Sequence, residues 1–382
     1  MQRIYLDNAA TSWPKPPEVY VAVDRYFREL GAPAGRSAYA EAAEVEGAIT
    51  RARAAIARLI GAESPRQVAF AFNGTDALNM AIHGILRPGG HVIATDAEHN
   101  SVLRPLHMHA ERHGVEVTFV PCDGRGIINP ADVRAAIRPD TQLIVLTHAS
   151  NVTGALQPAA EVGAIAREHG IPLLLDAAQT LGDVPIDAEA LHVDLLAAPG
   201  HKGLLGPLGT GILYVRPGLE ERVQPLRQGG TGTRSEEEFQ PSAMPQRYES
   251  GNHNVPGLVG LEASLAWLAE RGVEWVRQHQ HNLVTTLLAG LRENSNVTLY
   301  GPESAEQRVG VVSLNVAGYD PQELAGGLDA AYRIQTRAGL HCAPRMHRSL
   351  GTLATGGTLR VSVGPFNTAE HIEAFLAALR EL

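Results

Sequence analysis

Several residues that can take part in chemistry, through a side chain or a backbone N–H group, stand directly after short apolar runs of this 382-residue sequence. They are Gly74 and Thr75, His99, Asn151, Asp176 with Gln179, and His201 with Lys202. If the apolar runs are parallel strands, their carboxyl ends lie at one edge of a sheet, where open α/β sheets bind ligands. We therefore expect these side chains to form one site.

The residue types in this set fit pyridoxal 5'-phosphate. That cofactor needs a lysine amine for a Schiff base and an acid that keeps its ring nitrogen protonated. Lys202 and Asp176 can supply these two groups. His99 can lie over the ring, and Asn151 and Gln179 can hydrogen-bond to its hydroxyl group.

The phosphate of such a cofactor needs hydrogen-bond donors. The segment NGTDALN is typical of a helix start, whose free N–H groups bind anions, so Gly74 and Thr75 together with His201 can provide a phosphate site. Taken alone, a Gly-Thr pair is more often a simple helix cap, and an aspartate at a strand end is more often a turn residue. The joint pattern, with each residue after an apolar run and in order, favours the cofactor.

Cys342 is one of two cysteines in the chain and lies in the segment RAGLHCAPRMHRSLG. The neighbours that can carry positive charge are Arg337, His341, Arg345 and His347. Positive charge favours a thiolate, so Cys342 is a candidate nucleophile. The alternative is an inert buried thiol, which is the usual state of a lone cysteine and our interpretation of Cys122.

Two groups of residues have side chains that metals prefer, but neither has a convincing spacing. The segment around Cys342 has no second cysteine and no paired Cys-x-x-Cys or His-x-x-x-His. His107, His109 and His113 lie on a helical pattern without a suitably placed carboxylate, which favours a solvated helix face. We therefore predict no metal site.

Composition excludes several classes of protein. The net charge of −9 and the absence of a long basic run argue against a nucleic-acid surface. No apolar run approaches the roughly 18–20 residues that span a bilayer, and the N-terminus lacks the apolar core of a signal peptide. Two cysteines cannot build a disulfide framework, so we expect a reducing, cytoplasmic location with no membrane partner.

Short apolar runs alternate with helical patterns through the first two-thirds of the chain. The expected strands are 67–72, 91–96, 115–120, 141–147, 171–177, 193–198 and 211–215. The expected helices are 74–86, 100–113, 130–138 and 158–169. This alternation predicts an α/β fold with a mostly parallel, doubly wound sheet.

The last third of the chain has a different organisation. Residues 227–257 are polar and glycine-rich, which predicts a long functional or interfacial loop. The segments that follow predict one long helix over 256–292, strands 309–316 and 358–363, and helices 321–331 and 367–381. We expect a large cofactor-binding domain over 15–262 and a smaller α/β domain made of 1–14 and 263–382.

Several segments, taken together, resemble the class V aminotransferase superfamily of fold type I. They are YLDNAAT (5–11), NGTDALN (73–79), AEHNS (97–101), THASNVTG (147–154), LLLDAAQT (173–180) and APGHKG (198–203). RAGLHCAP (337–344) is similar to the cysteine desulfurase and selenocysteine lyase branch, in its second, short-loop group. The resemblance covers essentially the whole chain. It implies conversion of L-cysteine to L-alanine, with the sulfur transferred to Cys342 as a persulfide.

The resemblance also implies roles for individual residues. Lys202 would bind the cofactor covalently, with His99 stacked on the ring and able to handle protons. Arg360, in TLRVSVG, would bind the substrate carboxylate, a bidentate task suited to a guanidinium group. Such enzymes are typically homodimers that hand sulfur to a small acceptor protein. Asn252, in YESGNHN, would reach the phosphate of the partner subunit's cofactor.

Two positions depart from the pattern of the family. Pro199 stands where a serine that contacts the phosphate is usual, and Asn252 stands where a threonine is common. The alternatives to desulfuration are a selenocysteine lyase, a cystine C–S lyase or another class V reaction that does not need Cys342. A scaffold that has lost catalysis is a further alternative, although Lys202 and Asp176 give no sign of it.

Overall fold

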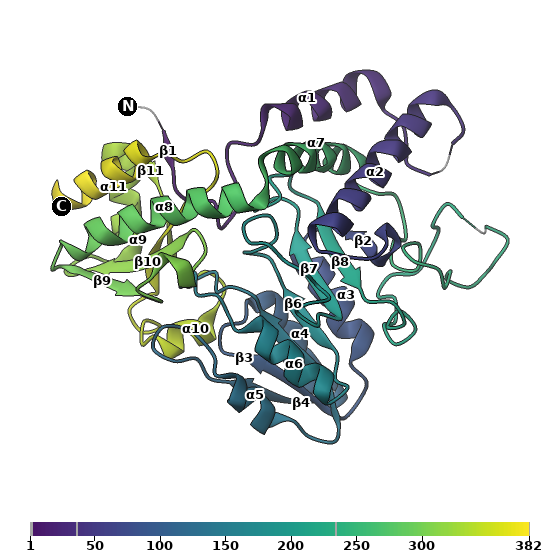
Figure 1. The fold of residues 1–382 in the computed structure, drawn as a ribbon, viewed down its shortest axis with the longest axis horizontal. Coiled ribbons are helices and arrows are strands. Elements are labelled where there is room, and N and C mark those ends of the chain that lie inside the picture. Colours follow the sequence, from purple (N-terminus) through teal and green to yellow (C-terminus); the bar gives the residue numbers. More distant parts are fainter. Residues whose placement is uncertain (1–2, 36, 234, 382) are drawn as a thin grey trace.

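A seven-stranded sheet forms the centre of the larger part of the molecule (Figure 1). The computed structural model describes residues 3–35, 37–233 and 235–381. The strand order across the sheet is β2 (Val68–Ala71), β8 (Gly211–Val215), β7 (Leu195–Pro199), β6 (Leu173–Asp176), β5 (Thr141–Thr147), β3 (His91–Thr95) and β4 (Glu116–Val120). The pairs from β7 to β4 are parallel, whereas β8 is antiparallel to both β7 and β2. The expected mostly parallel sheet is thus confirmed.

Helices cover both faces of this sheet because its central strands are apolar on both sides. Every residue of β2, β3, β6, β7 and β8 is buried, as expected of strands between two layers of helices. One face packs against α3 (Gly74–Ile85) and α4 (Asn100–His113). The other packs against α2 (Ala40–Leu59), α5 (Pro130–Ala136), α6 (Ala159–Glu168) and α7 (Val255–Arg271). The fold is therefore doubly wound.

A smaller antiparallel sheet lies beside the first part of the molecule, at the left of Figure 1. Its strand order is β12 (Arg337–Gly339), β13 (Thr358–Ser362), β10 (Val311–Val316) and β9 (Val297–Tyr300). The helices of this part are α8 (Val273–Arg292), α9 (Pro321–Tyr332), α10 (Pro344–Ser349) and α11 (Ala369–Glu381). A separate hydrophobic core joins α8, α9 and α11 to the sheet. The strands and helices expected between 309 and 381 are confirmed within one or two residues at most ends.

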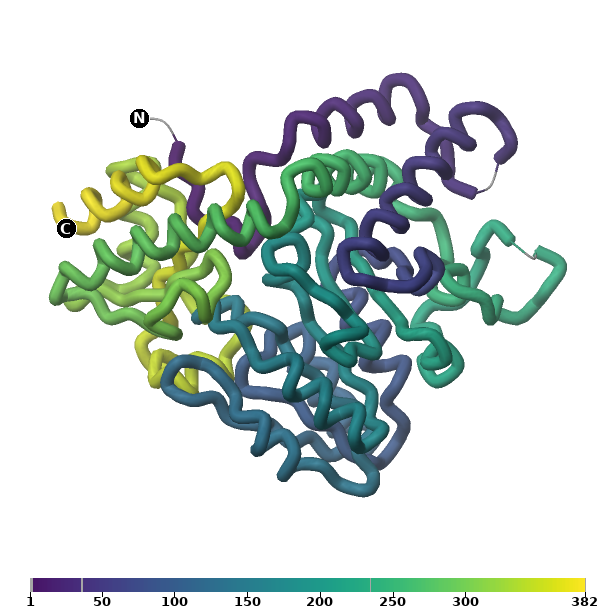
Figure 2. Tube along the Cα trace, in the orientation of Figure 1, coloured from purple at the N-terminus to yellow at the C-terminus, as the bar shows by residue number. Residues whose placement is uncertain are grey.

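The N-terminal segment joins the two parts of the molecule. Strand β1 (Ile4–Tyr5) pairs in parallel with β11 (Ile334–Gln335), more than 300 residues later in the chain. The chain then crosses to the larger part, where α1 (Pro17–Arg25) lies along α7 (Figure 2). Short helical turns complete the list of elements: η1 (Tyr26–Leu30), η2 (Pro65–Gln67) and η3 (Ala305–Gln307).

The single helix expected over 256–292 is wrong. The chain forms two helices there, because Gly272 has a backbone φ of +85° that ends α7 and precedes α8. Glycine adopts this conformation without steric cost, whereas a helix interior requires negative φ. A domain boundary near this point stays a prediction.

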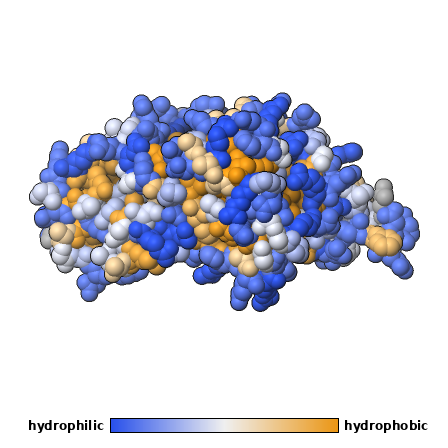
Figure 3. All heavy atoms as spheres, turned by 90° about the horizontal axis from the view of Figure 1, so that it is seen from below, coloured by the Kyte–Doolittle hydropathy of each residue, from blue (hydrophilic) through white to orange (hydrophobic). Residues whose placement is uncertain are grey.

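The described residues between β8 and α7 contain no helix or strand, as expected for 227–257, and part of this segment projects at the right of Figures 1 and 2. On the face seen from below in Figure 3, apolar residues (orange) are exposed at several places between hydrophilic ones (blue). Scattered exposure of this kind is usual for folded proteins. Among the described residues, none of the helices combines the length and apolar character needed to cross a membrane.

Candidate active site

A cavity of about 100 Å³ lies at the carboxyl ends of the strands of the large sheet. Its walls include Gly74, Thr75, His99, Asn151, Asp176, Gln179, His201 and Lys202. These are the cofactor-binding residues expected from the sequence, with the exception of Asn252. They come from the ends of different strands, and the parallel arrangement of those strands brings them together.

Asp176 and Lys202 form the charged part of this cavity. Asp176 is the last residue of β6 and its Oδ1 accepts a hydrogen bond of 2.9 Å from the amide of Ala178. Burial raises the pKa of Asp176, and the nearby Lys202 partly opposes this. Burial also lowers the pKa of Lys202 to about 8, assisted by Arg360 and opposed by Asp176. The amine of Lys202 is therefore easier to deprotonate than an ordinary lysine, which suits a nucleophile.

The N-terminus of α3 forms one end of the cavity and offers donors for an anion. Thr75 Oγ1 lies 2.7 Å from Ser101 Oγ, which in turn lies 2.9 Å from His99 Nδ1. The buried Nδ1 of His201 has no hydrogen-bond partner among the described residues. A side chain at Gly74 would place its Cβ 3.0 Å from Pro199 Cδ, so glycine lets the start of α3 pack closely against Pro199. Free amide groups and an unpartnered ring nitrogen fit a phosphate.

His99 caps α4 and is held in one tautomer. The amide of Ser101 donates a hydrogen bond of 3.0 Å to its Nδ1, so the ring proton of a neutral His99 is on Nε2. Burial, with the charges of Lys202 and Arg337, lowers the pKa of His99 to about 4. His99 is therefore neutral at neutral pH.

Arg360 reaches the site from β13 of the smaller sheet. Its side chain is 1% exposed and makes an ion pair of 2.8 Å with Asp7 and a hydrogen bond of 3.0 Å to the carbonyl oxygen of Asn151. Its buried Nε has no partner among the described residues. A buried guanidinium group with a free donor can bind a carboxylate.

Cys342 lies in a short segment that is fastened to the larger part of the molecule. Asn151 Nδ2 donates a hydrogen bond of 2.6 Å to the carbonyl oxygen of His341, and the amide of Asn100 donates one of 2.7 Å to the carbonyl oxygen of Cys342. Both His341 and Cys342 have positive φ, at 47° and 59°. The thiol is half-buried, and its Sγ lies 4.0 Å from a nitrogen of Arg337.

Only part of the positive charge expected around the thiol is available to it. Arg345 forms an ion pair of 2.7 Å with Asp96. His341 and His347 are buried, which lowers the pKa of each well below its usual value and makes both neutral. Arg337 is thus the cation in contact with Cys342 among the four that the sequence offers.

Two other predictions from the sequence have different outcomes. The exposed Asn252 lies outside the cavity that holds Lys202, so its role toward a partner subunit stays a prediction. The solvated face expected for the histidines of α4 is wrong for His109, which is buried and has its Nε2 2.9 Å from Nδ1 of His83. No group of three or more His, Cys, Asp or Glu side chains suited to a metal ion occurs in the part of the chain that the structure describes.

Several residues of the site were not singled out from the sequence. Ser101 follows His99 by two positions, and Glu98 precedes it, fully buried, within the motif AEHNS. Asp7 belongs to the motif YLDNAAT. All three lie inside segments that carry the family resemblance, so the signal was present although no role was assigned.

Comparisons with known proteins agree with this geometry. A family model described as Aminotransferase class-V matches residues 4–375. A probable cysteine desulfurase of Methanothermobacter thermautotrophicus is 34% identical over 99% of this chain and 94% of its own length. A cysteine desulfurase of Salmonella agona is 30% identical over 99% of this chain and 93% of its own. The apo structure of a cysteine desulfurase from Thermococcus onnurineus superimposes with a TM-score of 0.92 at 31% identity, over 99% of this chain and 94% of that one.

Proposed function

Because this chain belongs to the aminotransferase class-V family, we propose that it is a pyridoxal-phosphate-dependent cysteine desulfurase, which converts L-cysteine to L-alanine. We propose further that Cys342 accepts the sulfur as a persulfide. The observation that carries the proposal is the hydrogen bond from the amide of Asn100 to the carbonyl oxygen of Cys342. Asn100 follows His99, which lines the same cavity as Lys202 and Asp176. The names of relatives that match nearly the whole chain support the reaction.

The residues around the cavity fit the cofactor. Asp176 would hold the ring nitrogen, and Lys202 would bind the aldehyde carbon. Thr75, His201 and the amides of the α3 N-terminus would bind the phosphate, because they combine free donors with an unpartnered ring nitrogen. When bound, the cofactor supplies an electron sink for the Cα of an amino acid.

The chain's own groups perform the remaining tasks. Arg360 binds the substrate carboxylate, for which its unpartnered Nε and its pairing with Asp7 prepare a buried cationic site. Lys202, with its lowered pKa, takes a proton from the substrate Cα and returns one. His99 remains neutral, so it adds no positive charge over the ring.

Sulfur transfer is a step between two sulfur atoms. The thiolate of Cys342 attacks the sulfur of the substrate, so that an S–S bond forms and the substrate's Cβ–S bond breaks. The electron pair of the broken bond stays on Cβ, which takes up a proton and becomes the methyl group of alanine. No external oxidant is needed, because the carbon is reduced as the sulfur is oxidised. A thiol reductant or an acceptor protein then removes the added sulfur.

The quaternary structure, acceptor and location belong to the same proposal. We propose a homodimer in which Asn252 contacts the phosphate of the partner's cofactor, consistent with its exposed position. A small sulfur-acceptor protein and a reducing, cytoplasmic location are proposed from the family and from the two free cysteines.

Peptide mass spectrometry after turnover tests the function. The protein is incubated with L-cysteine without reductant, and we expect one added sulfur atom on Cys342 and formation of alanine. Cys342→Ser should lose both, and the matched Cys122→Ser variant should keep both. Alanine formation that survives in Cys342→Ser would contradict sulfur transfer to Cys342 and favour a lyase.

A further inference from the structure

The carbonyl oxygen of His201 is surrounded by donors from one stretch of the N-terminal segment. It accepts hydrogen bonds from the amide and the hydroxyl of Ser12, both at 3.1 Å, and from Thr11 Oγ1 at 3.2 Å. Lys15 Nζ donates to the same oxygen at 2.9 Å and to Ser12 Oγ at 2.8 Å. A carbonyl oxygen has two lone pairs, so four donors are an unusually dense arrangement.

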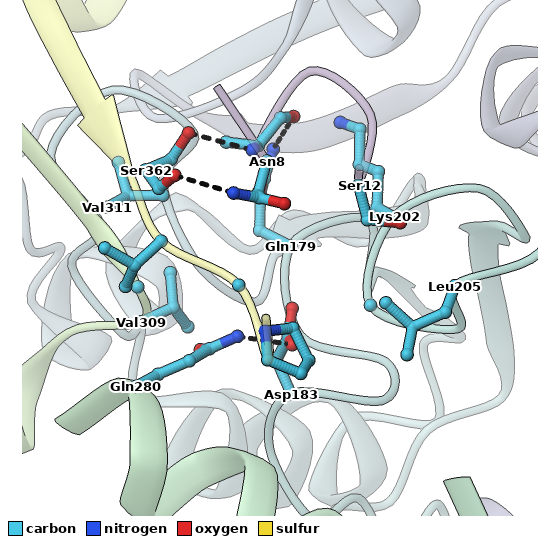
Figure 4. A pocket seen from close by; sticks show the side chains of 16 residues that line it. Asn8, Ser12, Gln179, Asp183, Lys202, Leu205, Gln280, Val309, Val311 and Ser362 are labelled. Atoms are coloured by element: carbon cyan, nitrogen blue, oxygen red, sulfur yellow. Dashed lines mark hydrogen bonds between the residues drawn. The ribbon is translucent and has the colours of Figure 1, made fainter. Parts of the chain in front are cut away.

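This oxygen belongs to the peptide bond between His201 and Lys202. Both residues line the cavity of about 100 Å³, His201 with an unpartnered ring nitrogen and Lys202 with its amine. A second cavity, of about 20 Å³, has Ser12 and Lys202 in its wall (Figure 4). The orientation of this peptide therefore affects how the side chains of His201 and Lys202 are placed in the cavity.

Lys15 is an unusual residue in this chain. The sequence contains two lysines, Lys15 and Lys202, and the other thirty basic residues are arginines. Lys15 is partly buried, and no carboxylate forms an ion pair with it within the described residues. Burial lowers its pKa to about 8. Burying an ammonium group without a carboxylate partner costs desolvation free energy. Its hydrogen bond to the His201 carbonyl oxygen offsets part of that cost, which indicates a positional role for this contact.

The difference between lysine and arginine explains the choice. An ammonium is a compact point charge with three donors, whereas a guanidinium is a planar fork suited to two acceptors side by side. The acceptors here are one carbonyl oxygen and one hydroxyl, both within 2.9 Å of Nζ. This geometry fits the smaller group.

The other end of the same segment is fixed to the smaller part of the molecule. Asn8 Nδ2 donates hydrogen bonds of 3.0 Å to the carbonyl oxygen of Ser362 and to Asn367 Oδ1. Asp7 pairs with Arg360. The segment from Asp7 to Lys15 thus links the arginine proposed for the substrate to the peptide that carries the proposed cofactor lysine.

We propose that Lys15 is a positioning residue, whose ammonium group holds the His201–Lys202 peptide and thereby fixes the Lys202 amine and the His201 ring toward the cofactor. The role of Lys202 toward the cofactor rests on the proposed function. The effect of Lys15 on the His201–Lys202 peptide does not depend on that function. Without the ammonium, the peptide keeps the weaker hydroxyl and amide contacts and samples more orientations.

The test compares Lys15→Met with Lys15→Arg and the unaltered protein. Methionine keeps the length of the side chain and removes the charge and the donors. Hydrogen–deuterium exchange of the amides of residues 201–206 is measured in the cofactor-free protein. We expect exchange about tenfold faster in Lys15→Met, the loss expected for a hydrogen bond to a charged donor, with Lys15→Arg between the two. The urea midpoint of global unfolding is measured alongside, so that a general loss of stability is recognised.

The protein with bound pyridoxal phosphate allows two further measurements. We expect the dissociation constant of pyridoxal phosphate to rise by about tenfold in Lys15→Met. The pH midpoint of the cofactor's visible absorption band should shift, because that band reports the surroundings of Lys202. Unchanged exchange at 201–206, or unchanged affinity and absorption, would overturn the proposal. Failure of the unaltered protein to desulfurate cysteine would instead overturn the proposed function and leave the exchange result standing.

Discussion

The amide of Asn100 donates a hydrogen bond of 2.7 Å to the carbonyl oxygen of Cys342. Asn151 holds the preceding carbonyl, that of His341, at 2.6 Å. The start of α4 and the turn after β5 therefore bind two adjacent peptide groups of the Cys342 segment. Because Asn100 directly follows His99, the bond sets the position of the thiol relative to the cavity. A segment fixed in this way delivers its thiol from a defined position.

The left-handed backbone at Cys342 predicts an unusual order of stability among its variants. A residue with a side chain pays about 1 kcal/mol or more at a φ of +59°, and glycine does not. We expect Cys342→Gly to be more stable to urea than Cys342→Ala by about 1 kcal/mol, although glycine is normally the less stable residue. Both variants lack the thiol, so the comparison isolates the backbone. Equal stability would mean that the segment relaxes out of this conformation.

Arg337 should control the reactivity of the thiol. Its guanidinium group lies 4.0 Å from Sγ, and a nearby cation favours the anionic sulfur that reacts with alkylating agents. We expect Arg337→Gln to slow alkylation of Cys342 by iodoacetamide at pH 7 severalfold, because the variant lacks the cation that contacts Sγ. The measurement uses a Cys122→Ser background, so that one thiol is followed.

Arg345→Gln is the matched control for that experiment. It removes an arginine from the same segment, but one whose charge is already paired with Asp96. Alkylation should keep its rate in this variant. An equal loss of rate in both variants would show that the thiol responds to net charge in general and not to the contact with Arg337.

The ion pair of Arg360 with Asp7 predicts a link between stability and carboxylate binding. Arg360 is 1% exposed, so Asp7→Asn leaves a buried guanidinium with an uncompensated charge, at a cost of about 3 kcal/mol. A ligand carboxylate can replace the missing charge. L-Alanine is the proposed product and carries such a carboxylate. We therefore expect L-alanine at about 10 mM to raise the melting temperature more in Asp7→Asn than in the unaltered protein.

Asp24→Asn serves as the control for this comparison. Asp24 pairs with Arg28 at the surface, where both side chains are well exposed, so the change should alter stability by less than about 1 kcal/mol. It should also leave the response to L-alanine unchanged. An equal response to L-alanine in Asp7→Asn and the unaltered protein would mean that Asp7 does not compensate the charge that the ligand meets.

The sequence was sufficient to predict the cavity because its residues are marked locally. Asp176 and Lys202 each follow a run of apolar residues that is buried on both faces, and such runs are recognisable without knowledge of their neighbours. The carboxyl-edge rule then assembles residues from different strands. The same reasoning cannot detect a break such as Gly272, where one residue in an otherwise helical pattern turns the chain.

The contributions of the N-terminal segment were beyond such reasoning. Asp7 meets Arg360 across 353 positions of sequence, and Lys15 meets His201 across 186. Neither contact follows from local spacing, because each depends on how β1 pairs with β11 and on how the chain crosses between the two sheets. The cationic neighbours of Cys342 illustrate the same limit, since proximity in sequence did not reveal that Arg345 is paired with Asp96.

Glu98 should give the protein a characteristic dependence on pH. It is fully buried, with Oε1 accepting hydrogen bonds from Thr95 Oγ1 at 2.7 Å and from the amide of Thr147 at 3.0 Å. Its Oε2 has no partner among the described residues. Burial raises the pKa of Glu98 to about 8 from 4.5. The folded protein therefore keeps this proton over a range in which the unfolded chain has lost it.

The sign of the effect follows from proton binding. Where the folded state binds more protons than the unfolded state, stability falls as the pH rises, so the contribution of Glu98 is complete below about pH 4.5 and is lost by about pH 8. Glu98→Gln removes this titration and keeps the shape of the neutral side chain. We expect the free energy of unfolding of the variant, minus that of the unaltered protein, to increase between pH 5 and pH 8 by about 1 kcal/mol per pH unit, so that the variant gains relative stability. The buried histidines titrate in both proteins and cancel in the difference. A difference that is constant with pH, measured by urea unfolding of the cofactor-free proteins, would mean that Glu98 is ionised in the folded state.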